Sequence, residues 1–257
     1  MIKLFFLVLA RDERYVDEKI EELKCLDVPY LIVCGAKLNH PNVVCREPKG
    51  KYDAINFGFR FIPEDVDVVA LNDVDTKISN FETAVKLFDS KDVALVFVKV
   101  LAEEGPQNLF LSMLRGLRRK LPIAASGDLM LIRYGVLKRV LPIKHCKAED
   151  SYLLFKVLEL NYGVADCTEC YVEGKKTKTA EEEKDYKRRT VCGIYQALAL
   201  TRPSPLIKLF YVLLPIASPV LLVLGKKGYF WMNGILLGLV DYLRGDRIGV
   251  WQPAHIE

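Results

Sequence analysis

Short, almost wholly apolar runs alternate with amphipathic stretches over the first two hundred residues, and this alternation most constrains the fold. Apolar runs of about four to eight residues are typical of strands that are covered on both faces. We predict such strands at residues 3–9, 30–34, 66–72 and 93–100.

Stretches with helical periodicity separate these runs, and each pair of strands therefore has room for a crossover helix. We predict helices at residues 16–26, 52–61, 81–88 and 107–120, the first with its charges on the outer face. This order predicts an α/β fold with a mostly parallel sheet flanked by helices. The carboxyl ends of the strands in such a sheet form the ligand crevice.

The composition changes near residue 203, where two long apolar segments begin. Residues 206–225 are almost wholly apolar and are long enough to span a bilayer, whereas residues 229–240 are short for a span. We predict a domain at 1–202 and a C-terminal apolar helical hairpin at 203–257 that re-enters or lies on the membrane, with Trp231 and Trp251 at interfacial depth. A buried helical hairpin or an oligomer interface is the alternative.

Charge and cysteine usage exclude some classes of protein. The 257 residues include 37 Lys and Arg and 33 Asp and Glu, so the net charge is 37 − 33 = +4. With no nucleic-acid motif beside it, this mild balance predicts no nucleic-acid partner.

Seven scattered cysteines are typical of free thiols in a reducing compartment. Cys167 and Cys170 form a lone CxxC that lacks nearby further ligands; we predict strand residues, with a metal or redox role as the alternative. The amino-terminal apolar run is too short for a signal peptide. We therefore expect the protein to lie at the cytoplasmic face of the cell membrane.

Two carboxylates, Asp73 and Asp75, follow the apolar run at 66–72. Neighbouring carboxylates repel one another unless a cation lies between them. Mg²⁺ and Mn²⁺ take oxygen ligands, and Mg²⁺ often binds one or two carboxylates together with substrate phosphates. The pair therefore suits a divalent cation that neutralises a diphosphate, although a solvated turn explains an isolated Asp-x-Asp equally well.

Further charged residues stand near predicted helix starts. Lys51 opens the helix at 52–61, where its ammonium and the free backbone N–H groups favour an anion. Glu149 and Asp150 open an amphipathic segment, and helix capping is one explanation of that pair. Gly127 lies shortly before them, and Arg188 and Arg189 are expected to open a later helix.

The order of these signals resembles a family 2 glycosyltransferase of GT-A fold, over about residues 1–200. The resemblance is carried by five stretches: Ala10-Arg11-Asp12-Glu13, Lys51-x-x-Ala54-x-Asn56-x-Gly58, Asp73-x-Asp75, Gly127 with Arg133, and Glu149-Asp150. It implies inverting, metal-assisted transfer of a sugar from a nucleoside diphosphate, with Mg²⁺ or Mn²⁺ as cofactor.

The resemblance also implies roles for individual residues. Glu13 matches an acid at the nucleoside, Asp73 the aspartate on the ribose and diphosphate side, and Asp75 the ligand of the metal, which Asp73 shares. Asp150 matches the general base, with Gly127 and Glu149 on the acceptor side. Lys51, Arg188 and Arg189 are expected at the donor diphosphate.

Three departures from the family pattern limit what the resemblance implies. Cys34-Gly35-Ala36-Lys37 replaces an acidic pair that reads the base, Lys77 replaces a polar ligand, and no tryptophan follows the arginines. We expect a UDP- or GDP-sugar as donor, and a polyprenyl phosphate or lipid-linked glycan as acceptor. The alternatives are an inactive membrane-bound scaffold and, less favoured, a sugar-nucleotide pyrophosphorylase, whose glycine-rich loop is missing after the first strand.

Overall fold

The computed structural model describes residues 2–102, 116–117, 121–174, 177 and 179–245. In this part of the chain one sheet has the strand order β3-β2-β1-β4-β7-β6-β8-β5. Its strands are β1 (Leu4–Ala10), β2 (Tyr30–Cys34), β3 (Val43–Cys45), β4 (Val68–Asp73), β5 (Thr76–Ser79), β6 (Val93–Ala102), β7 (Leu129–Arg133) and β8 (Gly163–Gly174). The helix predicted at 107–120 falls largely outside the described residues, as does Trp251. Trp231 is fully buried in the protein, so the prediction that it lies at interfacial depth was wrong.

The sheet is mixed, so the prediction of a mostly parallel sheet is confirmed only in part. Among the described strands, β1 is parallel to β2 and β4, β2 to β3, and β6 to β8, whereas β7 lies antiparallel between β4 and β6, and β5 is antiparallel to β8. The short apolar run of β7 reveals a strand but carries no information about its direction.

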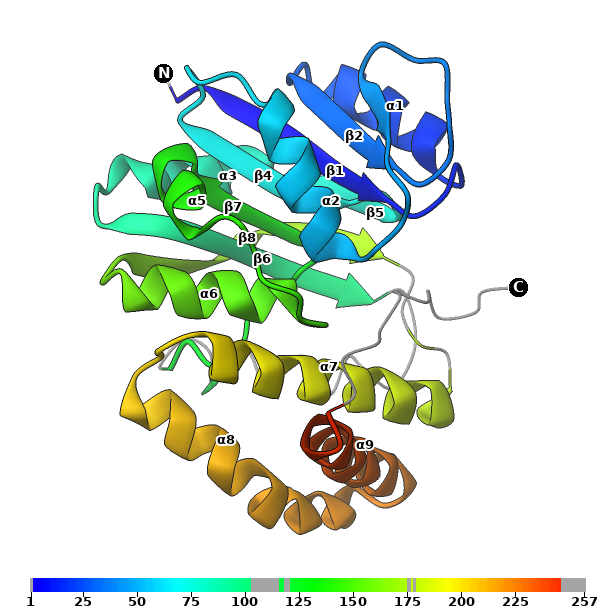
Figure 1. Ribbon diagram of the computed structural model, residues 1–257, viewed down its shortest axis with the longest axis vertical. Helices are drawn as coiled ribbons and strands as arrows, with labels where there is room; N and C mark the ends of the chain where they lie inside the picture. Colours follow the sequence, from blue (N-terminus) through cyan, green and yellow to red (C-terminus); the bar gives the residue numbers. More distant parts are fainter. Residues whose placement is uncertain (1, 103–115, 118–120, 175–176, 178, 246–257) are drawn as a thin grey trace.

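Helices cover both faces of the sheet (Figure 1). They are α1 (Val16–Cys25) and α3 (Phe81–Lys86) on one face, and α2 (Lys51–Gly58), α5 (Tyr134–Val140) and α6 (Glu149–Glu159) on the other. Successive residues of β1 alternate between two cores, since Leu7 and Leu9 pack with one and Phe6 and Val8 with the other. This two-sided burial explains the continuous apolar runs.

Lys19 of α1 points into the protein, although the charged residues of this helix were expected to face outward. The sequence predicts that all charges of this helix face outward, but the Lys19 side chain is buried. Its ammonium group donates to the backbone carbonyl of Thr76, and this contact brings it inside.

A third layer of helices lies beside α6 (Figure 1). It consists of α7 (Ala180–Leu200), α8 (Pro205–Ala217) with a 3-10 turn at Ser218–Leu224, and α9 (Lys226–Leu243). Helix α7 begins at a capping box made by Thr179 and Glu182. The prediction that Arg188 and Arg189 open this helix was therefore wrong, because they lie in its interior.

Close backbone contact joins α7 to α9. A Cβ atom added to Gly234 would lie 2.7 Å from the Lys184 carbonyl oxygen, and one on Gly238 would lie 2.6 Å from that of Arg188. Small residues at this spacing let two helices approach closely. The two helices lie on opposite sides of the predicted domain boundary at 202/203 and pack together. The boundary itself stays a prediction.

The segment Pro205–Leu224 has the length and apolar composition to cross a membrane, and most of it is exposed. By the same measures no other helix in the described residues does so. The two apolar segments form α8 with its 3-10 turn and α9, which are consecutive helices as the sequence predicts.

Candidate functional site

The carboxyl end of β4 directs two neighbouring side chains to opposite faces of the sheet. Alternation places Asn72 on the α1 side with Val68 and Ala70, and Asp73 on the other side with Val69 and Leu71. Asp73 is the last residue of β4, rather than lying just past the strand, and Asp75 follows in the turn to β5.

A lysine at the first position of α2 connects three segments of this site. The Lys51 ammonium forms an ion pair with Asp73 at the end of β4, and lies 3.9 Å from Glu149 Oε1 at the start of α6. Burial alone would lower the pKa of Lys51, but the negative charges of Asp73 and Glu149 outweigh burial and raise it above its ordinary value. Lys51 therefore carries its charge throughout the ordinary pH range.

The Asp73 carboxylate is buried, and one of its two oxygen atoms has no hydrogen-bond donor among the described residues. Burial is the largest cause that raises its pKa to about 7; the negative charges of Asp75 and Asp128 add to the rise, and Lys51 opposes it. Among the described residues, nothing donates a hydrogen bond to the buried Oδ1 atom. A buried carboxylate oxygen without a donor is suited to a cation or to a ligand hydroxyl group.

Asp150 lies in the first turn of α6 and has the pKa of a usable base. Burial, followed by the negative charge of Glu149, raises its pKa to about 6, while a hydrogen bond of 2.6 Å from the Ser151 backbone N–H to Oδ1 lowers it. A Cβ atom on Gly127 would lie 3.3 Å from Asp150 Oδ2. The structure therefore brings Gly127, Glu149 and Asp150 together, as the sequence predicts.

Asn56 and Gly58 have structural roles in this arrangement. The Asn56 amide donates to the Ile143 carbonyl at 2.9 Å and accepts from its N–H at 2.8 Å, which fixes the loop before α6 to α2. A Cβ atom on Gly58 would lie 2.6 Å from Leu7 Cδ1, so glycine permits close packing of α2 on the sheet.

Asp128 belongs to the site and was missed by sequence reasoning. Its carbonyl accepts from the Asp73 N–H at 3.0 Å and from the Asn72 side chain at 2.8 Å. The negative charge of its carboxylate raises the pKa of both Asp73 and Asp150. The available signal was its place between Gly127 and an apolar run, the same arrangement of a carboxylate beside a strand end that marked Asp73.

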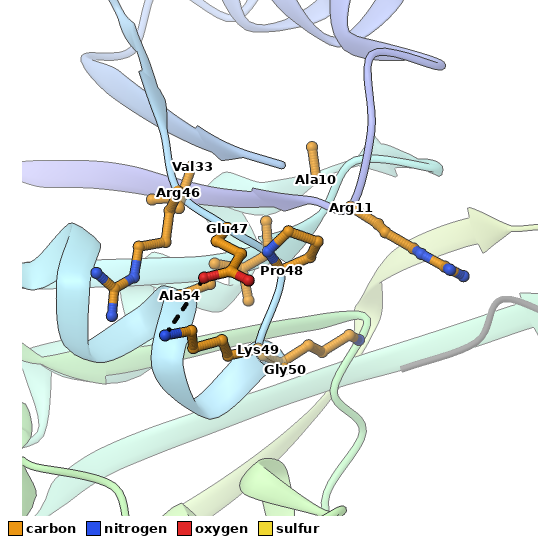
Figure 2. A pocket seen from close by; sticks show the side chains of 11 residues that line it. Ala10, Arg11, Val33, Arg46, Glu47, Pro48, Lys49, Gly50 and Ala54 are labelled. Carbon is orange, nitrogen blue, oxygen red and sulfur yellow. Dashed lines mark ion pairs between the residues drawn. The ribbon is translucent and has the colours of Figure 1, made fainter. Parts of the chain in front are cut away.

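A pocket opens beside Lys51 at the carboxyl ends of β1 and β2. It encloses about 470 Å³ of space continuous with solvent and is lined by Leu9, Ala10, Arg11, Val33, Arg46, Glu47, Pro48, Lys49, Gly50, Lys51 and Ala54. Figure 2 shows the Glu47 and Lys49 side chains meeting, with Arg11 and Arg46 extending in opposite directions. The lining is mainly basic and apolar, which suits an anionic ligand with a flat hydrophobic part.

Other residues that the sequence singled out have contacts elsewhere. Arg188 makes a two-pronged ion pair with Asp241 of α9, at 2.5 and 2.8 Å, and Arg189 lies over the Tyr186 ring. Arg133 donates to backbone carbonyls at the amino end of β6, including that of Val93 at 2.8 Å. Glu13 is exposed between β1 and α1. The donor roles of Glu13, Arg188 and Arg189 stay predictions.

The described residues contain no group of three or more His, Cys, Asp and Glu side chains that could hold a metal ion by themselves. Asp73 and Asp75 nevertheless fit a Mg²⁺ or Mn²⁺ ion whose other ligands come from a diphosphate and water, because Asp73 Oδ1 is available. All seven cysteines lie in the described part of the chain and are free thiols, and Cys167 and Cys170 are strand residues as predicted.

Solved structures with a similar fold include glycosyltransferases. A mannosyltransferase from Pyrobaculum calidifontis, in complex with GDP-Man and Mn²⁺, matches with a TM-score of 0.72 at 16% identity, over 94% of this chain and 87% of that one. Glucosyl-3-phosphoglycerate synthase from Mycobacterium tuberculosis, with Mn²⁺, UDP-glucose and phosphoglyceric acid, matches with a TM-score of 0.51 at 15% identity, over 77% and 80%.

A mycobacterial protein has a TM-score of 0.53 at 16% identity, over 77% of this chain and 75% of that one. No family model matches the sequence, and no curated protein matches it. The fold is GT-A-like. Since the mannosyltransferase match leaves only 6% of this chain uncovered, it extends into the C-terminal helices.

Replacing Lys51 with methionine tests whether its ammonium stabilises the cluster. At about pH 8, where Asp73 is mostly ionised, Lys51→Met should lower the free energy of unfolding by about 3 kcal/mol, because it leaves buried carboxylates unpaired. Lys49→Met is the matched control, since the exposed Lys49–Glu47 pair should contribute about 0–1 kcal/mol. Denaturant unfolding measures both changes, and equal losses in the two variants would contradict the role of Lys51.

Proposed function

We propose that the protein is a glycosyltransferase that moves a sugar, with inversion, from a UDP- or GDP-sugar to a polyprenyl phosphate or a lipid-linked glycan. The observation that carries this proposal is the unpartnered Oδ1 atom of Asp73, which lies with Asp75 at the strand end. The pocket beside Lys51 offers basic and apolar side chains to a nucleotide. The shared fold with a mannosyltransferase bound to GDP-Man and Mn²⁺ supports the same assignment.

In this mechanism the protein supplies charge at one side of the sugar and a base at the other. Asp73 and Asp75 would hold a divalent cation, which when bound would supply positive charge to the departing diphosphate. Lys51 fixes the Asp73 carboxylate at the donor side. The acceptor oxygen forms a bond to the anomeric carbon as the bond to the diphosphate breaks, and a hydroxyl acceptor gives its proton to Asp150.

The residues of the site favour this function over the two alternatives. A scaffold without activity needs no buried acid with a pKa raised to about 6, whereas a general base does. A pyrophosphorylase needs a glycine-rich loop after β1, where this chain has Ala10-Arg11-Asp12-Glu13.

Metal-dependent nucleotide binding tests the donor site. UDP, GDP, CDP and ADP are each added with Mn²⁺, Mg²⁺ or a chelator, and the melting temperature is measured. One nucleotide at about 100 times its Kd should add about 2.7 kcal/mol of stability. We expect this gain only with metal and only when Asp75 is present, so that Asp75→Asn loses it. Stabilisation that persists with the chelator would exclude the metal role.

The pH dependence of sugar transfer tests Asp150. A base works when deprotonated, so the rate with a hydroxyl acceptor should rise as pH increases through about 6. Asp150→Asn should lower that rate by about 100-fold or more and remove the acid limb, whereas Asp65→Asn, at an exposed residue, should change neither.

Transfer to a phosphate acceptor needs no base, because the attacking oxygen is already ionised. Asp150→Asn should then cost little. Retention of the full rate with a hydroxyl acceptor would instead refute the role of Asp150.

We further propose that α8 and its 3-10 turn lie in the plane of the membrane on its cytoplasmic face. One side of this segment is held on the protein, where Ile207 and Tyr211 are buried and the Tyr211 hydroxyl donates to the Ile123 carbonyl at 2.6 Å. The other side exposes Ile216 (73%), Val220 (70%) and Val223 (82%). A helix with one side held on the protein and the other apolar is suited to an interfacial position.

Charge on the same segments supports a membrane partner. Lys208, Lys226, Lys227 and Arg244 are all exposed and can approach anionic lipid head groups. Free thiols throughout the chain agree with a cytoplasmic position.

Flotation with lipid vesicles tests this surface. The full-length protein should float with vesicles that contain anionic lipid and should bind less at high salt. The double variant Ile216→Glu/Val220→Glu should stay in the soluble fraction, whereas Phe61→Glu, at an exposed apolar residue of another surface, should float normally. Equal flotation of the two variants would rule out α8 as the contact.

A further inference from the structure

A buried ion pair joins α1 to the segment that carries Asp75. Lys19 is 2% exposed, and its Nζ atom lies 2.6 Å from Glu22 Oε2 and also donates to the Thr76 carbonyl. The other carboxylate oxygen of Glu22 accepts from the Ile78 backbone N–H at 2.6 Å. The pair therefore holds β5 at two backbone positions.

These contacts lie where the chain leaves the main part of the sheet. Strand β4 lies between β1 and β7, but β5, only two residues further along the chain, pairs with β8 at the edge of the sheet. Strands β6 and β8 change register near residues 98–99, and beyond this point β8 lies between β6 and β5. Val74 and Asp75 thus form the joint between the main sheet and this extension of β6, β8 and β5.

The main sheet holds this joint through the backbone of Val74 and through the side chain of Thr76, whose hydroxyl also accepts from the Asn72 amide at 2.8 Å. The Val74 N–H donates to the Leu9 carbonyl at 3.1 Å, and the Thr76 hydroxyl donates to the Asp73 carbonyl at 2.9 Å. Beyond Asp75, Lys19 and Glu22 fix the backbone of Thr76 and Ile78. Asp75 therefore lies between backbone held by the main sheet on one side and backbone held by β8 and α1 on the other.

Electrostatic attraction to the carboxylates of the site is a second interaction of Lys19. Asp75 and Asp73 are near enough for their negative charges to attract the Lys19 ammonium. Lys19 approaches from the α1 side, whereas Lys51 approaches from the α2 side. Well-packed apolar residues often replace a buried ion pair without loss of stability, so packing alone does not account for a lysine here.

We propose that Lys19 and Glu22 are positioning residues that hold Asp75 where it binds the divalent cation of the donor. This inference rests on the proposed function, because it assigns a supporting pair to that same cation site. Outer partners that orient metal ligands typically contribute about 10–100-fold to metal affinity.

The test compares two neighbouring ion pairs of α1 in the full-length protein. Lys19→Met and Glu22→Gln alter the buried pair, and Lys24→Met and Glu21→Gln alter the exposed Lys24–Glu21 pair as matched controls. The double variant Lys19→Met/Glu22→Gln leaves no unpaired charge, and it replaces the single variants if they do not fold.

Two measurements are made on each variant. The first is the Mn²⁺ concentration that gives half of the thermal shift with the nucleotide that stabilises the wild type. We expect it to rise about tenfold in the buried-pair variants and to stay unchanged in the controls, whereas the maximal shift at saturating Mn²⁺ is preserved. A purely structural role would lower the melting temperature without changing the Mn²⁺ concentration needed.

The second measurement is hydrogen exchange at residues 74–79, which needs no ligand. The Ile78 amide should exchange faster in the buried-pair variants than in the controls. Unchanged exchange, or an unchanged Mn²⁺ requirement, overturns the inference. If the wild type binds no metal-nucleotide complex, the proposed function fails instead. Faster exchange in the buried-pair variants would then still show that Lys19 and Glu22 stabilise the backbone of β5.

Discussion

The ion pair between Lys51 and Asp73 is the contact on which the site depends. It joins the first residue of α2 to the last residue of β4, and the same ammonium reaches toward Glu149 at the start of α6. Like charges about 4 Å apart repel by about 4 kcal/mol at an effective dielectric constant near 20. Without a cation among them, the carboxylates that β4 and α6 bring together would force these segments apart.

The pattern of the main chain explains how so many acids meet at one place. Parallel strands β1 and β4 end at the same edge of the sheet, and antiparallel β7 begins there, so Asp73 and Asp128 arrive from opposite chain directions. Helix α6 begins beside them because Asn56 fixes the preceding loop. Burial is the largest cause of the raised pKa values of Asp73 and Asp150, and the negative charge that one lysine leaves unbalanced raises them further.

Local patterns in the sequence were sufficient for most of the elements and for half of the site. Apolar runs located β1, β2, β4 and β6 to within a few residues, because strands covered on both faces need such runs. Each of the pairs around Asp73 and Asp150 has an ordinary structural explanation when taken alone, and it was the order of the charged signals along the chain that singled them out. The contacts of Lys51 with Asp73 and Glu149 were not predicted, because the sequence placed Lys51 only at an anionic ligand.

The remaining features depend on residues distant in the chain, which local patterns do not reveal. The direction of β7 is given by its antiparallel pairing with β4 and β6. Lys19 has the sequence context of an outward charge, and only the carbonyl of Thr76, 57 residues later, explains its burial. Arg188 pairs with Asp241, 53 residues away. Such contacts decide whether a charged residue binds a ligand or joins two helices.

The C-terminal helices are connected to the site rather than appended to it. Gly193 of α7 lies so close to the segment before α6 that an added Cβ would be 2.6 Å from the Ala148 nitrogen, and the Gln196 side chain accepts from the Lys147 N–H at 2.9 Å. Helix α7 therefore packs directly behind Glu149 and Asp150. Helix α7 also binds α9 through the ion pair between Arg188 and Asp241. If α8 lies on the membrane, the proposed base Asp150 has a fixed distance from the membrane surface. A lipid-linked acceptor requires such a fixed distance.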